Sequence, residues 1–113
     1  MVEFNQNHKA VLDELFLELP NVRPGKMFGY PAYYAGKKLS ICVVGDGVGL
    51  KLPESTANRL LEEDPNITPF QPLGRRKMRE WVQINLDDPN GLANYTDVFD
   101  ESIAYVLSIQ ING

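Results

Sequence analysis

The middle of this chain alternates short apolar segments with tight-turn signals, and this pattern limits its fold more than any other feature. Gly36-Lys37 and Gly45-Asp46-Gly47 separate runs that are short and rich in β-branched and aromatic residues. Asp-Gly is expected to supply the positive φ angles that a tight hairpin turn requires. Consecutive hairpins of this kind form an antiparallel meander. Its predicted strands are residues 26–28, 31–35, 38–44 and 48–52.

Three helical segments flank these strands. The first is predicted over residues 7–19, where apolar side chains recur at three- and four-residue spacing before Pro20 ends the helix. A shorter helix is predicted at 53–62. The last begins at Asp88, a suitable N-cap, with Pro89 in its first turn. The apolar positions are Val11, Leu12, Leu15, Phe16 and Leu19 in the first helix and Leu92, Tyr95, Phe99, Ile103, Val106 and Leu107 in the last.

Two more extended segments lie between the second and third helices. Residues 67–73 contain Pro69 and Pro72, which cannot donate to a strand ladder, so we expect an edge strand or a loop. Residues 80–86 alternate in character and are predicted to form a strand. The order is therefore helix, β-meander, helix, two strands, helix. Because no βαβ alternation occurs, this order indicates an α+β fold with an antiparallel sheet and helices packed on one face.

Length and charge set further limits. The 113 residues fit one domain, which we expect to span residues 1–113. The net charge of −4 and the pI of about 4.9 argue against a surface dominated by phosphate contacts, because nucleic-acid-binding domains are usually basic. No apolar run approaches the ~20 residues that a membrane helix needs, and the N-terminal residues do not resemble a secretory signal. We therefore expect a cytoplasmic protein with no membrane contact.

The residue types that catalysis and metal binding need are scarce. The one histidine, His8, is expected to be exposed, and the one cysteine, Cys42, to be buried in an apolar run. These residues cannot assemble a structural zinc site or a nucleophilic triad. The glycines of residues 45–49 suggest a phosphate-binding loop, but a strand follows them where such a loop needs a helix. We predict a protein that is not an enzyme and has no metal or cofactor.

Several short motifs follow one another in a definite order. They are Lys26-Met27-Phe28-Gly29, a tyrosine-rich strand, Gly36-Lys37-Lys38, a hairpin ending in Gly49-Leu50-Lys51-Leu52, and Met78-Arg79-Glu80-Trp81-Val82 before a helix led by Asp-Pro. This arrangement resembles the N-terminal domain of the TfoX/Sxy competence regulators, and the related YjbR-like domains, over about residues 1–109. The resemblance implies a compact α+β domain with a curved antiparallel sheet, similar in plan to secretion-chaperone-like folds. It implies no catalytic residues and no assigned biochemical role.

The segment around Lys26 can be interpreted in two ways. In the structural interpretation it is a short strand that points Met27 or Phe28 into the core. In the functional interpretation it borders a binding groove lined by Lys26, Tyr30 and Tyr34. Both interpretations agree with the sequence.

A basic run is the second candidate for binding. Arg75, Arg76, Lys77 and Arg79 follow one another closely in an otherwise acidic chain. They can form a solvated loop, or they can contact phosphate or an acidic partner, since arginine matches oxyanions in bidentate geometry.

The function predicted from these features is that of a small binding or adaptor domain with an unidentified protein partner. The alternative is a nucleic-acid-associated transcriptional or competence regulator that uses the basic run, which the acidic pI disfavours. We also predict a homodimer, the commonest assembly, because a single small sheet cannot cover all the aromatic residues on the short strands. These residues are Tyr30, Tyr33, Tyr34 and Phe70.

Overall fold

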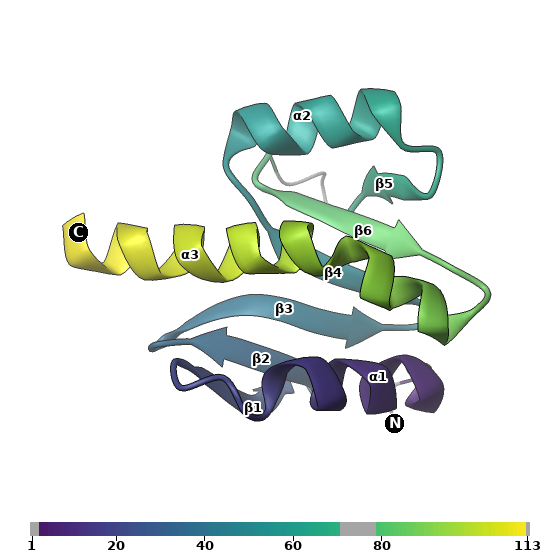
Figure 1. Ribbon diagram of the computed structural model, residues 1–113, viewed down its shortest axis with the longest axis horizontal. Helices are drawn as coiled ribbons and strands as arrows, with labels where there is room; N and C mark the ends of the chain where they lie inside the picture. Colours follow the sequence, from purple (N-terminus) through teal and green to yellow (C-terminus); the bar gives the residue numbers. More distant parts are fainter. Residues whose placement is uncertain (1–2, 71–78, 113) are drawn as a thin grey trace.

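A curved six-stranded sheet with helices on one face forms the protein (Figure 1), as described by a computed structural model for residues 3–70 and 79–112. The sheet is antiparallel, in the strand order β1-β2-β3-β4-β6-β5. The predicted α+β class and antiparallel sheet are confirmed. The strands are β1 (Val22–Met27), β2 (Tyr30–Ala35), β3 (Lys38–Val44), β4 (Gly47–Lys51), β5 (Ile67–Pro69) and β6 (Trp81–Asn85). The helices are α1 (Gln6–Phe16), α2 (Glu54–Glu63), the 3-10 helix η2 (Pro89–Tyr95) and α3 (Thr96–Asn112).

The first four strands form the predicted meander, and β6 then pairs with β4, which leaves β1 and β5 at the two edges. The short β5 contains Pro69, in agreement with the prediction of an edge strand or loop. The register between β2 and β3 shifts at Tyr33 and Tyr34, which leaves Ser40 as an extra residue in β3. The hydroxyl groups of Ser40 and Ser102 of α3 form a buried hydrogen bond, 2.8 Å long. The extra residue of β3 therefore connects the sheet to the helix.

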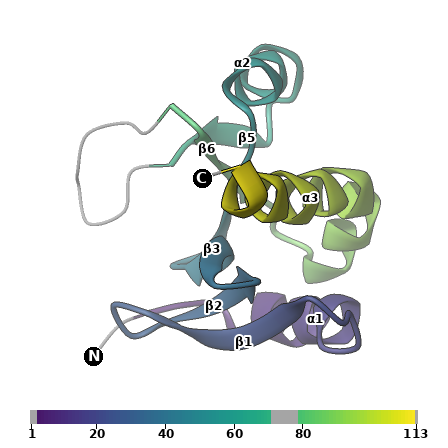
Figure 2. The same cartoon turned by 90° about the vertical axis from the view of Figure 1, so that its left-hand side faces the viewer.

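The core lies between the sheet and the helices. Figure 2 shows α1 and α3 on the same side of the sheet. The rings of Phe16 and Tyr33 meet edge to face with centroids 5.2 Å apart, and those of Phe16 and Phe99 at 5.3 Å. These contacts join α1, β2 and α3. Other buried members of this cluster are Leu12, Val22, Ile41, Val43, Val48, Leu50, Leu52, Ala57, Ile67, Val82, Ile84 and Leu92.

A smaller cluster lies on the other face of the sheet. It contains Ala32, Cys42, Phe70 and Trp81, and the rings of the last two stack at 5.4 Å. Cys42 is fully buried, as predicted, and burial raises the pKa of its thiol to about 12. Phe70 is also buried within the single chain.

The first helix differs from its prediction at both ends. The side chain of Asn5 accepts hydrogen bonds from the backbone N–H groups of Asn7 and His8, so α1 begins one residue early. Its last residue is Phe16, and Leu19, three residues beyond, is 36% exposed. The prediction that His8 is exposed was wrong. The ring is fully buried, with Nε2 3.1 Å from the Leu86 carbonyl oxygen, because His8 lies on the same helix face as the core residues.

The last helix, one turn and the first strand also differ in detail from their predictions. Asp88 and Pro89 begin a helix as predicted, but its first seven residues are the 3-10 helix η2. The turn between β3 and β4 has Gly45 at φ 57°, whereas Asp46 does not adopt a positive φ among the described residues. The predicted Asp-Gly turn was therefore displaced by one residue. The strand predicted at 26–28 is longer and ends at Met27.

Candidate binding surface on the first hairpin

The turn between β1 and β2 is a two-residue hairpin of unusual composition. Met27 pairs with Tyr30, and the turn residues Phe28 and Gly29 have φ angles of 49° and 89°. Positive φ at both positions characterises a type I′ turn. Phe28 is 76% exposed, whereas Met27 packs against the smaller cluster. The structural interpretation, in which Met27 or Phe28 points inward, is confirmed through Met27. Phe28 stays outside the core because the hairpin reverses before it.

The predicted groove residues lie near one another, but they do not share a face. Tyr30 and Tyr34 alternate along β2 and face the same side of the sheet, whereas Lys26 pairs with Pro31 and faces the other side. The contact between them involves the backbone: the Tyr34 hydroxyl donates to the Lys26 carbonyl oxygen at 2.8 Å. The Tyr34 ring crosses Gly25, where an added Cβ would lie 2.8 Å from Cε2 of the ring. Lys26 itself is exposed, and Tyr30 and Tyr34 are half-buried.

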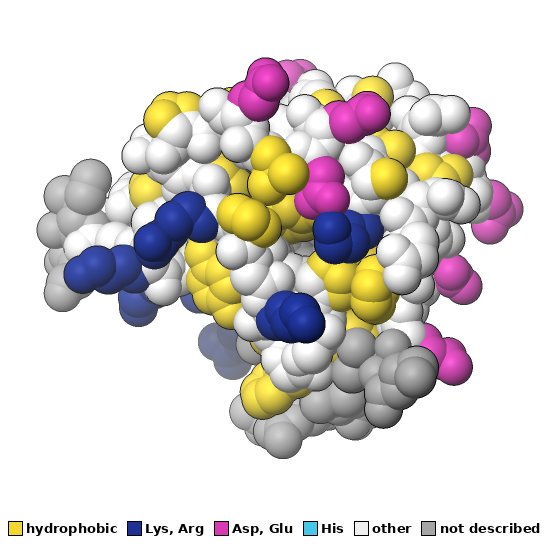
Figure 3. All heavy atoms as spheres, turned by 90° about the horizontal axis from the view of Figure 1, so that it is seen from below, with side chains coloured by type: hydrophobic (Ala, Val, Ile, Leu, Met, Phe, Trp, Pro, Cys, Tyr) yellow, Lys and Arg dark blue, Asp and Glu magenta, His cyan; other side chains and the backbone are white. Residues whose placement is uncertain are grey.

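The charge of this region contrasts with that of the rest of the chain. Residues 21–45 contain four of the 11 Lys and Arg residues and none of the 15 Asp and Glu residues. All four are exposed, and within the part of the chain that the structure describes none forms an ion pair, whereas Lys9, Lys51 and Arg59 each pair with a carboxylate. Figure 3 views the molecule from the side of β1 and α1 and shows basic side chains on the left and at the centre of this face. Most acidic side chains lie toward its upper and right margins, and one lies beside a basic side chain near the centre. We name Arg23, Lys26, Lys37 and Lys38 the basic edge.

The backbone beneath the basic edge is held in place by side-chain hydrogen bonds. Arg23 Nη2 donates to the Gly36 carbonyl oxygen at 3.0 Å and so ties β1 to the turn between β2 and β3. Gln110 of α3 binds both sides of that turn: its Oε1 accepts from Lys37 N at 2.9 Å and its Nε2 donates to the Ala35 carbonyl oxygen at 2.8 Å. The lysine side chains therefore extend from a fixed turn.

The free edge of β1 is poorly suited to pairing with another strand. Pro24 has no N–H group to donate, and the Lys26 carbonyl already accepts the Tyr34 hydroxyl. The Val22 N–H donates to Leu19 O at 3.3 Å. Such features protect edge strands from adding a further strand. Contacts made by this edge must therefore come mainly from side chains.

The basic run of the sequence lies mostly outside the described residues. Of its members Arg75, Arg76 and Lys77 are not described, and Arg79 is exposed in the turn before β6. Its neighbour Glu80 accepts a hydrogen bond from Tyr105 and lies 3.6 Å from Lys51 Nζ.

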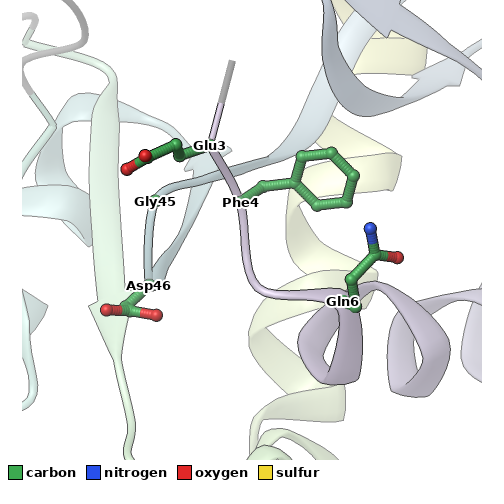
Figure 4. A pocket seen from close by; sticks show the side chains of 5 residues that line it. All are labelled: Glu3, Phe4, Gln6, Gly45 and Asp46. Carbon is green, nitrogen blue, oxygen red and sulfur yellow. The ribbon is translucent and has the colours of Figure 1, made fainter. Parts of the chain in front are cut away.

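A hollow of about 380 Å³ lies where the N-terminal segment meets the turn between β3 and β4. Backbone hydrogen bonds join Asn5 N to Gly45 O at 2.8 Å and Gly45 N to Glu3 O at 2.9 Å. Figure 4 shows the carboxylates of Glu3 and Asp46 on one side and the Phe4 ring on the other. Among the described residues no group of three or more His, Cys, Asp or Glu could hold a metal ion, so this pair of carboxylates has no third ligand of those types.

A second hollow, of about 250 Å³, separates the loop after α1 from α3 and is lined mainly by apolar side chains such as Leu19, Ile103 and Leu107. It places no set of convergent polar groups next to one another. Within residues 3–70 and 79–112, no helix is both long and apolar enough to cross a membrane.

Comparisons with protein-family models, with curated proteins and with solved structures each found no match to this chain. The resemblance to the TfoX N-terminal domain thus stays a prediction that rests on the sequence motifs. Sequence reasoning found Lys26, Tyr30 and Tyr34 but missed Arg23, Lys37 and Lys38. The signal that could have found them is the absence of any carboxylate from residues 21–45 of an acidic chain.

Proposed function

We propose that this protein is a non-enzymatic binding or adaptor domain that takes an acidic segment of a partner protein on its basic edge. The observation that carries the proposal is a set of four exposed cations, none of which is in an ion pair among the described residues. Three of them, Arg23, Lys37 and Lys38, lie at or next to the turn that Arg23 and Gln110 hold, and Lys26 lies nearer the other end of β1. A small cytoplasmic domain of the TfoX N-terminal type would fit this role, and any part in competence stays a prediction.

Electrostatics favours a short acidic segment over a long polyanion. The basic edge attracts carboxylates, whereas the remainder of the chain holds all 15 Asp and Glu residues and repels a duplex that extends beyond the edge. Exposed ion pairs contribute about 0.2–1 kcal/mol each. Binding through three or four of them should therefore be weak and should decline as salt screens the charges.

Side chains rather than backbone groups would make the contacts. Because Pro24 and the Tyr34 hydroxyl limit pairing along β1, a bound segment need not adopt a strand in register with the sheet. Recognition would then depend on the spacing of carboxylates in the partner and on apolar contacts nearby.

The test is a titration of labelled poly-L-glutamate, followed by fluorescence anisotropy at low salt and again at physiological salt. One variant replaces Lys26, Lys37 and Lys38 with alanine and keeps Arg23, which also holds the turn. A matched control replaces Lys9, Lys51 and Arg59, the cations that are already in ion pairs. Both variants lose three positive charges. We expect the first to bind about ten-fold more weakly than wild type, and the control to change much less.

An equal loss of affinity in both variants would contradict the proposal, because affinity would then follow net charge alone. Duplex DNA forms the second arm of the experiment. If DNA binds more tightly than polyglutamate, and alanine at Arg75, Arg76, Lys77 and Arg79 abolishes that binding, the nucleic-acid alternative replaces this one.

A further inference from the structure

Phe28 is unfavourable for the fold in two independent respects. It is the only non-glycine residue with positive φ in the described part of the chain, at 49°. The left-handed region is unfavourable for an ordinary residue because Cβ crowds the following carbonyl oxygen. It also exposes 76% of a large aromatic side chain to water. A residue kept at such a position indicates a role outside the stability of the fold.

The turn chemistry makes this contrast sharper. Asn-Gly is among the most favoured pairs for a type I′ turn, because asparagine and glycine both tolerate positive φ. Gly29 already satisfies the second position, so a single change from Phe28 to asparagine would give the preferred pair. The neighbouring residues on either side do contribute to the fold, since Met27 packs on the smaller cluster and Tyr30 is half-buried.

The surroundings of Phe28 suggest what it contacts. Lys26 is two residues away and exposed. Asp46 lies in the turn between β3 and β4, which is at the same end of the antiparallel sheet as this hairpin tip. A partner that approaches from the side of Lys26 meets an aromatic ring and positive charge together. Interfaces are commonly anchored by a few aromatic residues that fill apolar pockets.

We infer that Phe28 anchors the partner at the tip of the hairpin: its ring occupies an apolar site on an acidic polypeptide segment, while Lys26 contacts the carboxylates beside that site. This inference rests on the proposed function and adds to it the chemistry of the partner. The segment carries large apolar side chains among its acidic residues, and polyglutamate alone lacks the group that Phe28 recognises.

The experiment compares two probes, poly-L-glutamate and a copolymer of glutamate and tyrosine, on wild type and Phe28→Asn. We expect wild type to bind the copolymer about ten-fold more tightly than polyglutamate, since aromatic residues are enriched among the few interface positions that supply most of the binding energy. Phe28→Asn should remove this preference and leave the affinity for polyglutamate unchanged. In urea melts the same variant should lower the unfolding equilibrium constant about five-fold, because the left-handed strain is relieved.

Leu17→Asn is the matched control. Leu17 is 49% exposed and has an ordinary φ of −66°, so its replacement removes exposed apolar surface at a distance in the sequence from the hairpin. We expect it neither to stabilise the protein by relief of strain nor to alter the preference for the copolymer.

Three results would overturn the inference. Phe28→Asn could destabilise the fold, which would make the ring a structural contact. The copolymer preference could be absent in wild type or survive in the variant. Finally, Phe28 could be required for binding vesicles of phosphatidylcholine and phosphatidylserine while the copolymer preference is absent, which would assign the tip to a lipid surface. Failure of the proposed function would give a different result from failure of this inference. It would appear as an equal loss of polyglutamate binding in the variant that lacks the lysines of the basic edge and in its charge-matched control.

Discussion

The network around Asp13 offers a quantitative test of how the first helix is held on the sheet. Asp13 of α1 accepts a hydrogen bond from the Tyr33 hydroxyl at 2.5 Å and another from Lys9 Nζ at 2.7 Å. Tyr33 is buried, and its hydroxyl also lies 3.3 Å from the Lys9 carbonyl oxygen. Asp13→Ala removes the carboxylate and leaves the Tyr33 hydroxyl with only the longer contact.

The magnitude follows from these contacts. A hydrogen bond to a charged group is worth about 1.5–3 kcal/mol, and the remaining contact of Tyr33 places the loss in the lower part of that range. In the ion pair, the Lys9 side chain is 40% exposed and the Asp13 side chain is 26% exposed. Because solvent screens this pair, it adds no more than about 0.5 kcal/mol. Alanine regains about 0.5 kcal/mol through its better helix propensity. We expect a net loss of about 2 kcal/mol in the free energy of unfolding at pH 7.

The dependence on pH supplies an independent check. Burial raises the pKa of Asp13, but the hydrogen bonds from Lys9 and Tyr33 outweigh it, so the pKa lies below the ordinary value of 3.8. A carboxyl with a lowered pKa stabilises the fold above its unfolded pKa, and this contribution is lost as pH falls through the folded pKa. The difference between wild type and Asp13→Ala should therefore be constant from pH 7 to about pH 5 and shrink below about pH 4.

The assay is urea unfolding followed by circular dichroism, for wild type, Asp13→Ala, Tyr33→Phe and the double variant. Tyr33→Phe should lower the free energy of unfolding by about 1 kcal/mol, because water can hydrate the Asp13 carboxylate that loses its hydrogen bond. The double-variant cycle should give a coupling energy of about 1 kcal/mol between Asp13 and Tyr33. A loss below about 0.5 kcal/mol for Asp13→Ala, the level of an ordinary surface change, would refute this reasoning. So would a difference that does not decrease in acid.

Three further predictions concern packing and assembly. Phe99→Ala should cost about 3–5 kcal/mol in denaturant melts, because its fully buried ring contacts Phe16 at the centre of the core. Gly36→Ala should cost about 1–3 kcal/mol by the same measurement, since Gly36 has φ 62° and an added Cβ would lie 2.6 Å from Gln110 Oε1. The homodimer stays a prediction with less support, because Tyr33 and Phe70 are buried within one chain; sedimentation at micromolar concentration that finds only a 12.7 kDa species would reject it.

Local sequence patterns were sufficient for the class of fold. Alternating β-branched residues, glycine-containing turns and helical spacing each act over a few residues, so their meaning does not depend on distant parts of the chain. The spacing of residues in α1 also indicates that His8 is buried, because His8, Leu12 and Phe16 lie four residues apart on one helix face. The prediction of exposure gave too much weight to the polar ring and too little to that spacing.

The candidate site depended on the tertiary structure. Arg23, Lys37 and Lys38 are spread over 16 residues of sequence, and they form one surface because β1 lies at the sheet edge and Gln110 of α3 fixes the neighbouring turn. No local pattern in the sequence placed these three residues side by side, since the pairing of strands is set by the packing of the whole sheet.

Phe28 shows the same division between local and tertiary information. Its sequence neighbours indicate a short strand and a nearby glycine, which the structure contains. Whether the aromatic ring points into the core or away from it depends on the residue at which the hairpin reverses. Pairing of Met27 with Tyr30 settles that position, and the register is determined by the pairing of β1 with β2 along its full length. The sequence by itself therefore determined the strands and turns, and only tertiary pairing decided that Phe28 is exposed.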